Sequence, residues 1–163
     1  MYLGLENVAY ALFVESLIRM NRNLTAILRG LPSDDAYDVG AMLVEAGITR
    51  IELPVTTPDA LESIQILARE FGDQTEIGAG NVVSLADVER IASAGGRMIS
   101  SPNLDVDIVA ATKAAGLASF PGVFTATECF AALRANPDGL SIFPANQMGA
   151  MGMKALRDVL PQE

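Results

Sequence analysis

One hydroxyl interrupts an apolar run near the carboxyl end of the chain, where residues 139–145 read GLSIFPA. A short apolar run that ends at proline is typical of a strand. Side chains alternate between the two faces of a strand, so Ser141 and Phe143 share one face while Leu140 and Ile142 share the other. The pattern therefore places a lone serine on an otherwise apolar inner face, and its chemistry has to be explained.

Similar runs alternate with helix-like segments along the whole chain. Strands are predicted at residues 23–30, 48–54, 75–81, 96–103, 117–122 and 139–145. Helices are predicted at residues 33–47, 57–72, 84–95, 105–116, 125–136 and 149–160, with a further helix at about 5–21 before the first strand. Ser33 and Thr57 are the predicted N-caps of the first two helices that follow strands, because their hydroxyls can accept hydrogen bonds from free backbone N–H groups.

This alternation predicts an α/β fold with a parallel sheet and right-handed crossovers. A doubly wound sheet and a (β/α)8 barrel both fit six βα units after an N-terminal helix. The polar inner-face residues Arg29, Glu52 and Ser141 fall near the carboxyl ends of their strands, which favours the barrel. No linker or change of composition divides the chain, so residues 1–163 are expected to form a single domain.

Composition excludes several classes of function. The net charge of −9 argues against nucleic-acid binding, so any anion site must be built locally. The longest apolar stretch near the N-terminus, residues 8–14, is too short to span a membrane, and no signal peptide is expected. The single cysteine, Cys129, suits the cytoplasm. The chain has no histidine, which removes serine–histidine nucleophiles and most catalytic zinc sites.

The strand ends resemble one enzyme family in order and spacing, from about Asn23 to Leu160. The motifs are TAILRG, RIELPVTTPDALESI, IGAGNV, SSPN, FPGVFTATE and LSIFPANQMGAMGMKAL. Together they resemble the 2-keto-3-deoxy-6-phosphogluconate (KDPG) and 2-keto-3-deoxy-6-phosphogalactonate (KDPGal) aldolases, and TAILRG favours the phosphogalactonate branch. The resemblance implies a TIM barrel, (β/α)8, usually assembled as a trimer.

The resemblance also implies a class I aldolase that needs no metal and no cofactor. In such enzymes a lysine forms a Schiff base with the C2 ketone of the substrate. The C3–C4 bond then breaks, which gives pyruvate and glyceraldehyde 3-phosphate, while a glutamate moves protons. Glu52 matches that glutamate, and Arg29 matches an arginine that suits a substrate carboxylate or hydroxyls. The residue-based alternative is an ion pair of Glu52 with Arg29 or Arg50.

The other family positions concern substrate binding. Gly80 and Asn81 match a GAGT turn near the pyruvate carboxylate, with asparagine in place of the family's threonine. Pro121 and Gly122 match a turn after the fifth strand, where a purely structural role is equally open. Phe143, on the face of Ser141, is expected to make the site apolar.

This sequence departs from the family pattern in two ways that bear directly on activity. The family pattern at the sixth strand is LK-x-FP, so Ser141 occupies the position of the Schiff-base lysine, and a serine cannot form an imine. The two lysines, Lys113 and Lys154, lie on predicted helices and are expected to be solvated. Only six of the eight expected βα units are present, which would leave sheet edges exposed. Three explanations fit: another chain covers these edges, the sheet rearranges, or the sequence is a piece of a longer chain. Association into a homo-oligomer is the expectation that follows from the first.

The favoured hypothesis is therefore a carbon–carbon lyase of the aldolase family whose retro-aldol activity is impaired. Its expected partners are pyruvate or a phosphorylated sugar acid, with no nucleic acid and no membrane. The alternative is a truncated paralogue that binds a small keto acid or another subunit without catalysis. A metal-dependent aldolase is a poor fit, because no second carboxylate ligand accompanies Glu52.

Overall fold

The computed structural model describes residues 22–161, so the expected helix at residues 5–21 lies outside the described part of the chain. The strands are β1 Arg22–Ile27, β2 Ile48–Pro54, β3 Glu76–Gly80, β4 Met98–Ser100, β5 Ala118–Phe120, β6 Gly122–Val123 and β7 Ser141–Ile142. The helices are η1 Ser33–Asp35, α2 Ala36–Glu45, α3 Ala60–Phe71, α4 Leu85–Ser93, α5 Val106–Ala114, α6 Ala126–Arg134 and α7 Ala145–Arg157. Strands and helices alternate as predicted.

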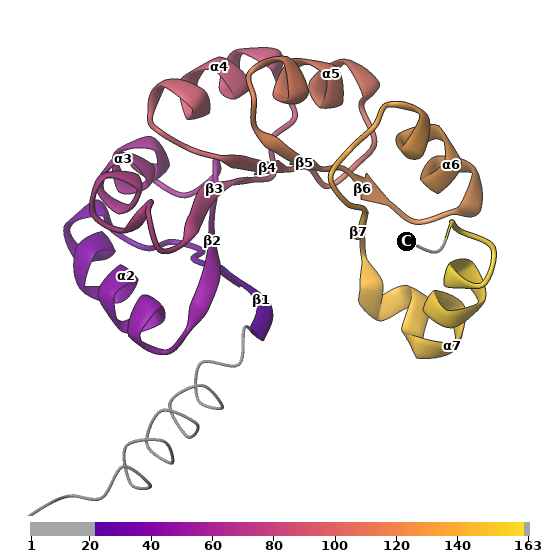
Figure 1. Ribbon diagram of the computed structural model, residues 1–163, viewed down its shortest axis with the longest axis horizontal. Helices are drawn as coiled ribbons and strands as arrows, with labels where there is room; N and C mark the ends of the chain where they lie inside the picture. Colours follow the sequence, from indigo (N-terminus) through magenta and orange to yellow (C-terminus); the bar gives the residue numbers. More distant parts are fainter. Residues whose placement is uncertain (1–21, 162–163) are drawn as a thin grey trace, which may run out of the picture.

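The strands follow one another around an arc, with the helices on its outer side (Figure 1). Strands β1 to β5 form one parallel sheet in sequential order, and β6 pairs with β7 in a second parallel pair. Sequential order with helices on one side is the arrangement of a barrel wall, whereas a doubly wound sheet has helices on both faces. The barrel prediction is therefore confirmed, and the described strands form an open arc.

The predicted fifth strand is divided into β5 and β6 by Pro121. Proline has no backbone N–H and cannot donate to a neighbouring strand, which explains the break. The chain changes partner at this point, because β5 pairs with β4 whereas Gly122 of β6 lies opposite Ser141 of β7. A side chain at position 122 would collide with the backbone of Ser101 and Pro102, so glycine is needed for this close approach.

Three predicted helix starts are wrong. The first helix opens with the 3-10 turn η1 after Pro32, and Ser33 does not cap it. Helix α3 begins at Ala60, and the hydroxyl of Thr57 instead accepts a hydrogen bond of 3.2 Å from the backbone N–H of Gly30. Helix α7 begins at Ala145 rather than at residue 149, with a kink where Gly149 adopts φ 66°.

The core lies between the sheet and the helices, and the alternation along β2 shows why. Ile51 and Leu53 are fully buried against the helices, together with Ile64 and Leu67 of α3. The alternate residues of β2 therefore face the inside of the arc. A smaller apolar cluster joins Val123 and Cys129 with Ile142, which fixes the outward side of β7.

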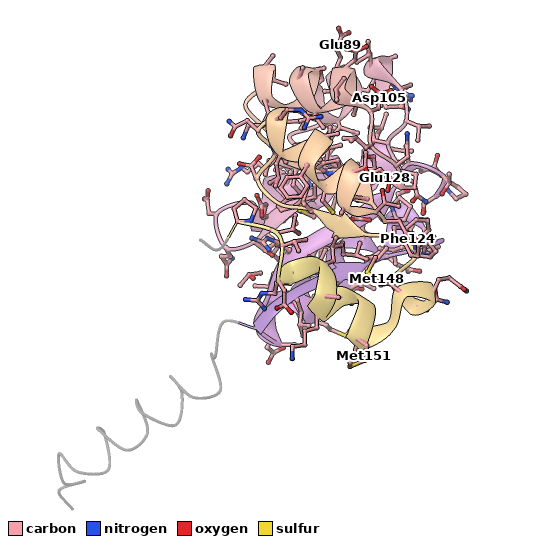
Figure 2. All side chains as sticks on the ribbon, turned by 90° about the vertical axis from the view of Figure 1, so that its right-hand side faces the viewer. Glu89, Asp105, Phe124, Glu128, Met148 and Met151 are labelled. Carbon is pink, nitrogen blue, oxygen red and sulfur yellow. The ribbon has the colours of Figure 1, made fainter. Side chains whose placement is uncertain are left out.

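Helix α7 covers this end of the arc only loosely, since none of its residues is buried. Figure 2 turns this side toward the viewer and labels Phe124, Met148 and Met151 on it. Met151 is 81% exposed. Within residues 22–161, no helix is both long enough and apolar enough to cross a membrane.

Candidate active site

A cavity of about 240 Å³ opens on the inner side of the arc. It receives side chains from five strands and from the residue before β7 and is lined by Thr25, Ile27, Arg50, Glu52, Met98, Ser100, Phe120, Leu140 and Ser141. Glu52 and Ser141, more than eighty residues apart in sequence, therefore meet at one cavity, as their positions on predicted strands required. A larger hollow of about 670 Å³ lies between α3 and α4, and no predicted site residue lines it.

Glu52 is the ionisable group on which the chemistry of the cavity depends. Its Oε2 accepts a hydrogen bond of 2.9 Å from the Ser100 hydroxyl on β4. Burial raises the pKa of Glu52 above its ordinary value of 4.5, while the Ser100 hydrogen bond and the charge of Arg29 act in the opposite direction. Glu52 is therefore a carboxyl group whose proton is held more tightly than usual, which suits general acid–base work.

Gly80 provides the space that the Glu52 side chain occupies. Strands β2 and β3 are paired so that Pro54 lies opposite Gly80, two residues beyond Glu52. A Cβ atom at position 80 would collide with Oε1 of Glu52. Gly80 is buried, and the next residue, Asn81, adopts φ 58°, a left-handed conformation that asparagine tolerates better than most residues. A substrate contact by Gly80 or Asn81 stays a prediction.

Ser141 is held by the backbone of the turn that follows β5. Its N–H donates to the carbonyl oxygen of Pro121 at 3.0 Å, and Gly122 is its partner in the β6–β7 pair. The side chain of Ser141 is half-buried at the cavity. Pro121 and Gly122 thus have a clear structural role in placing Ser141, and a substrate contact by either residue remains a prediction.

Of the eight predicted site residues, Glu52 and Ser141 line the cavity and the other six do not. Arg29 is exposed just beyond the end of β1, close enough for its charge to lower the pKa of Glu52. Phe143 is 51% exposed beyond the end of β7. Both residues were placed on the inner face by continuing the alternation of side chains beyond the last residue of the strand. Beyond that residue the backbone is no longer extended, so the alternation does not hold.

Arg50 is one of the cavity residues to which the sequence analysis gave no site role. It was considered as an ion-pair partner of Glu52, but its Nε bonds Oε2 of Glu76 at 2.9 Å instead. Its guanidinium also lies over the ring of Phe120, 5.6 Å from the ring centroid. The sequence could have predicted this position, because residues two apart on a strand point to the same face and Arg50 is two residues from Glu52.

Ser100 was missed because two serines follow each other at the end of β4. Only one of them can face the cavity, and it is Ser100. Ser101 is buried, and its hydroxyl donates to the carbonyl oxygen of Asn103 at 2.7 Å. Which residues of this three-residue strand face the cavity is set by the register of β4 against β3, and the sequence alone does not give that register.

The lysines lie away from the cavity. Lys113 on α5 forms an ion pair of 2.7 Å with Asp138. Lys154 is exposed in the last turn of α7. Within residues 22–161, no three histidine, cysteine, aspartate or glutamate side chains gather as a metal site. The cavity therefore offers a carboxyl group, an arginine and several hydroxyls as its polar groups.

Comparison with known proteins settles the family. A family model described as KDPG and KHG aldolase matches residues 14–162. The chain belongs to this aldolase family. It is 43% identical over 142 residues to the probable 2-dehydro-3-deoxy-6-phosphogalactonate aldolase of Rhizobium meliloti, covering 87% of this chain and 67% of that protein. It is 36% identical to the 2-dehydro-3-deoxy-6-phosphogalactonate aldolase of Escherichia coli K12, covering 86% of this chain and 68% of the relative.

Solved structures agree with the fold. A native KDPGal structure matches with a TM-score of 0.83 and 36% identity, covering 85% of this chain and 68% of that one. The KDPG aldolase of Legionella pneumophila, solved with pyruvate captured as a covalent carbinolamine intermediate, matches with a TM-score of 0.79 and 26% identity over 89% of this chain and 70% of that one. The aldolase resemblance read from the strand ends, with its phosphogalactonate preference, is thus confirmed at the level of sequence and fold.

Proposed function

We propose that this aldolase-family chain binds the pyruvate part of a 2-keto-3-deoxy-6-phospho sugar acid in the 240 Å³ cavity. The reaction to which it is suited is retro-aldol cleavage to pyruvate and glyceraldehyde 3-phosphate, with the phosphogalactonate substrate favoured by the identities to the KDPGal aldolases. One observation carries the proposal: Glu52 and Ser141 lie at the same cavity on the inner side of the arc.

Glu52 is the group that would move protons. Cleavage of the C3–C4 bond requires that the C4 hydroxyl lose a proton while the bonding electron pair moves onto the pyruvate fragment. A carboxylate with a raised pKa can accept that proton and return one to C3 of the product. Arg29, Asn81, Phe143 and the backbone at Gly80 and Gly122 lie outside the cavity lining, so they are proposed contacts for the part of the substrate that extends beyond the cavity.

Ser141 makes this cleavage slow. A protonated imine on lysine would accept the electron pair from the broken bond as a neutral enamine, whereas serine leaves the C2 oxygen to carry an enolate charge. Hydroxyl groups of Thr25 and Ser141 line the cavity and could donate to that oxygen, but neither replaces a covalent electron sink. We therefore expect weak or absent turnover in this chain.

A second candidate function is non-catalytic binding of a small keto acid or of another subunit. It is favoured by the exposed apolar side chains at both ends of the arc, which include Ile27 of β1 and Phe124, Phe130 and Met151 around α6 and α7. Such side chains support association. We expect a homo-oligomer in a single-domain, cytoplasmic protein, and sedimentation of a stable monomer at micromolar concentration would contradict this expectation.

A coupled assay of pyruvate release from the phosphogalactonate and phosphogluconate substrates tests the proposed function. We expect background rates from the wild-type chain and a gain of cleavage in Ser141→Lys. Ser93→Lys adds a lysine at an exposed position of α4 and serves as the matched control. If pyruvate binds but Ser141→Lys does not cleave, binding without catalysis is the better description. If Ser93→Lys cleaves the substrate equally well, the proposed active site at Ser141 is wrong.

A further inference from the structure

The contact between Glu52 and Ser100 has no assigned role in the proposed chemistry. Ser100 is the last residue of β4, and Glu52 lies on β2, with β3 between them. The hydroxyl reaches across β3 beside Gly80, where the Cβ of any other residue would occupy the place of the Glu52 carboxyl group. The result is a hydrogen bond of 2.9 Å from Oγ of Ser100 to Oε2 of Glu52.

We propose that Ser100 is a positioning residue that fixes the Glu52 carboxyl group in the orientation needed for proton transfer. Ser100 acts through Glu52 and not through the reacting bond. The inference rests on the proposed function only for its effect on turnover, because the orientation and the proton affinity of Glu52 are properties of the chain itself.

Two surfaces restrict the Glu52 side chain. On one side its Oε1 lies against the backbone of Gly80, at the place where any other residue would carry a Cβ. On the other side Oε2 is held by Ser100. Among the described residues 22–161 this is the one hydrogen bond from another side chain to the Glu52 carboxylate, so removing it would free the side chain to rotate.

The charged groups around Glu52 do not replace this contact. From the segment that follows β1, Arg29 acts on Glu52 through its charge. From β2, Arg50 is engaged with Glu76 of β3 and with the ring of Phe120 of β5. The cavity residues of β4 and β7 are uncharged, so the Ser100 hydroxyl is the close donor to this carboxylate.

The physical consequence concerns both orientation and proton affinity. A hydrogen bond to the charged form of a carboxyl group lowers its pKa, whereas burial raises it. Ser100 thus moderates the effect of burial on the pKa of Glu52. A carboxyl group within reach of the substrate also transfers protons efficiently only if its rotamer is fixed, since small misplacements are costly in rate.

The test measures the pKa of Glu52 by NMR of carboxyl carbons in the whole chain. We expect Ser100→Ala to raise this pKa above the wild-type value and Ser100→Thr to return it toward that value, because threonine keeps the hydroxyl. Ser101→Ala is the matched control, since its hydroxyl bonds Asn103 and not Glu52. An unchanged pKa of Glu52 in folded Ser100→Ala, or an equal shift in Ser101→Ala, would overturn the proposal.

Turnover provides the second measurement, in the Ser141→Lys background. Loss of a general acid–base group costs roughly 10²–10⁴-fold in rate, so we expect Ser100→Ala to lower kcat by about tenfold and less than Glu52→Gln does, with KM little changed. The acid limb of the pH profile should move upward with the pKa of Glu52. If Ser100→Ala fails to fold, Ser100→Cys keeps only a weak donor, and its Glu52 pKa should lie above the wild-type value; an unchanged pKa in folded Ser100→Cys would overturn the proposal. A pKa shift without any turnover in Ser141→Lys would refute the proposed function and leave the positioning contact intact.

Discussion

Substitution of Gly80 by alanine tests whether the Glu52 side chain is built into the fold as described. The added Cβ would lie 2.5 Å from Cδ and 3.0 Å from Cγ of Glu52 and would collide with Oε1. Gly80 is buried within β3, and its carbonyl oxygen accepts a hydrogen bond of 2.9 Å from Val55, so the backbone has little freedom to move. The carboxyl group must therefore rotate away from Ser100.

The cost follows from three contributions. Overpacking of this kind typically destabilises by about 1–3 kcal/mol. Loss of the Ser100 hydrogen bond adds roughly 0.5–1.5 kcal/mol. The lower entropy of the unfolded alanine chain returns about 0.4–1 kcal/mol. We therefore expect Gly80→Ala to lower the free energy of unfolding by about 0.5–4 kcal/mol and to weaken any keto-acid binding that depends on Glu52.

Urea unfolding of a double-mutant cycle isolates the cause. If the collision is with the carboxyl group, Gly80→Ala should cost much less in a Glu52→Ala background, with a coupling of at least about 0.5 kcal/mol. Gly152→Ala on α7 is the matched control, because the added methyl meets only the flexible side chain of Met148. The reasoning is refuted if Gly80→Ala costs the same with and without Glu52, or if it costs nothing.

Two further predictions concern stability. Because burial raises the pKa of Glu52, the folded chain holds this proton more tightly than the unfolded chain, so ionisation of Glu52 lowers the free energy of unfolding as the pH rises above 4.5. Glu52→Gln should therefore gain stability relative to wild type between about pH 4 and pH 8 in urea titrations, and an equal difference at both pH values would contradict this. Leu67→Ala, which empties a fully buried position of α3, should lower the free energy of unfolding by about 2–5 kcal/mol. The exposed Leu85→Ala should change it by less than about 0.5 kcal/mol, and similar effects of the two substitutions would show that the core is misassigned.

The elements that the sequence predicted well are those whose limits are set by local chemistry. Strand β2 has the predicted bounds, because Gly47 precedes its alternating residues and Pro54 ends them. The meeting of Glu52 and Ser141 at one cavity followed from the same alternation, since parallel strands bring their inner faces together. The two-residue alternation and the glycine and proline at the strand ends were sufficient to predict these features.

The features that were missed depend on pairing between distant segments. Thr57 was predicted as an N-cap, but its hydroxyl serves the loop at Gly30, which lies beside it only after β1 and β2 have paired. The Arg50–Glu76 ion pair likewise requires the register of β2 against β3. Which of two adjacent serines reaches Glu52 depends on the register of β4. No local pattern encodes these registers.

Trapping with pyruvate and borohydride, read by mass spectrometry, tests most directly the claim that Ser141 occupies the Schiff-base position of the aldolase cavity. Borohydride reduces an imine between pyruvate and a lysine to a stable amine. The wild-type chain should carry no adduct, and Ser141→Lys should carry one at residue 141, where Phe120 and Met98 lower the polarity around the inserted amine. An adduct at Lys113 or Lys154 of the wild-type chain, or a folded Ser141→Lys variant that traps no pyruvate, would contradict the account.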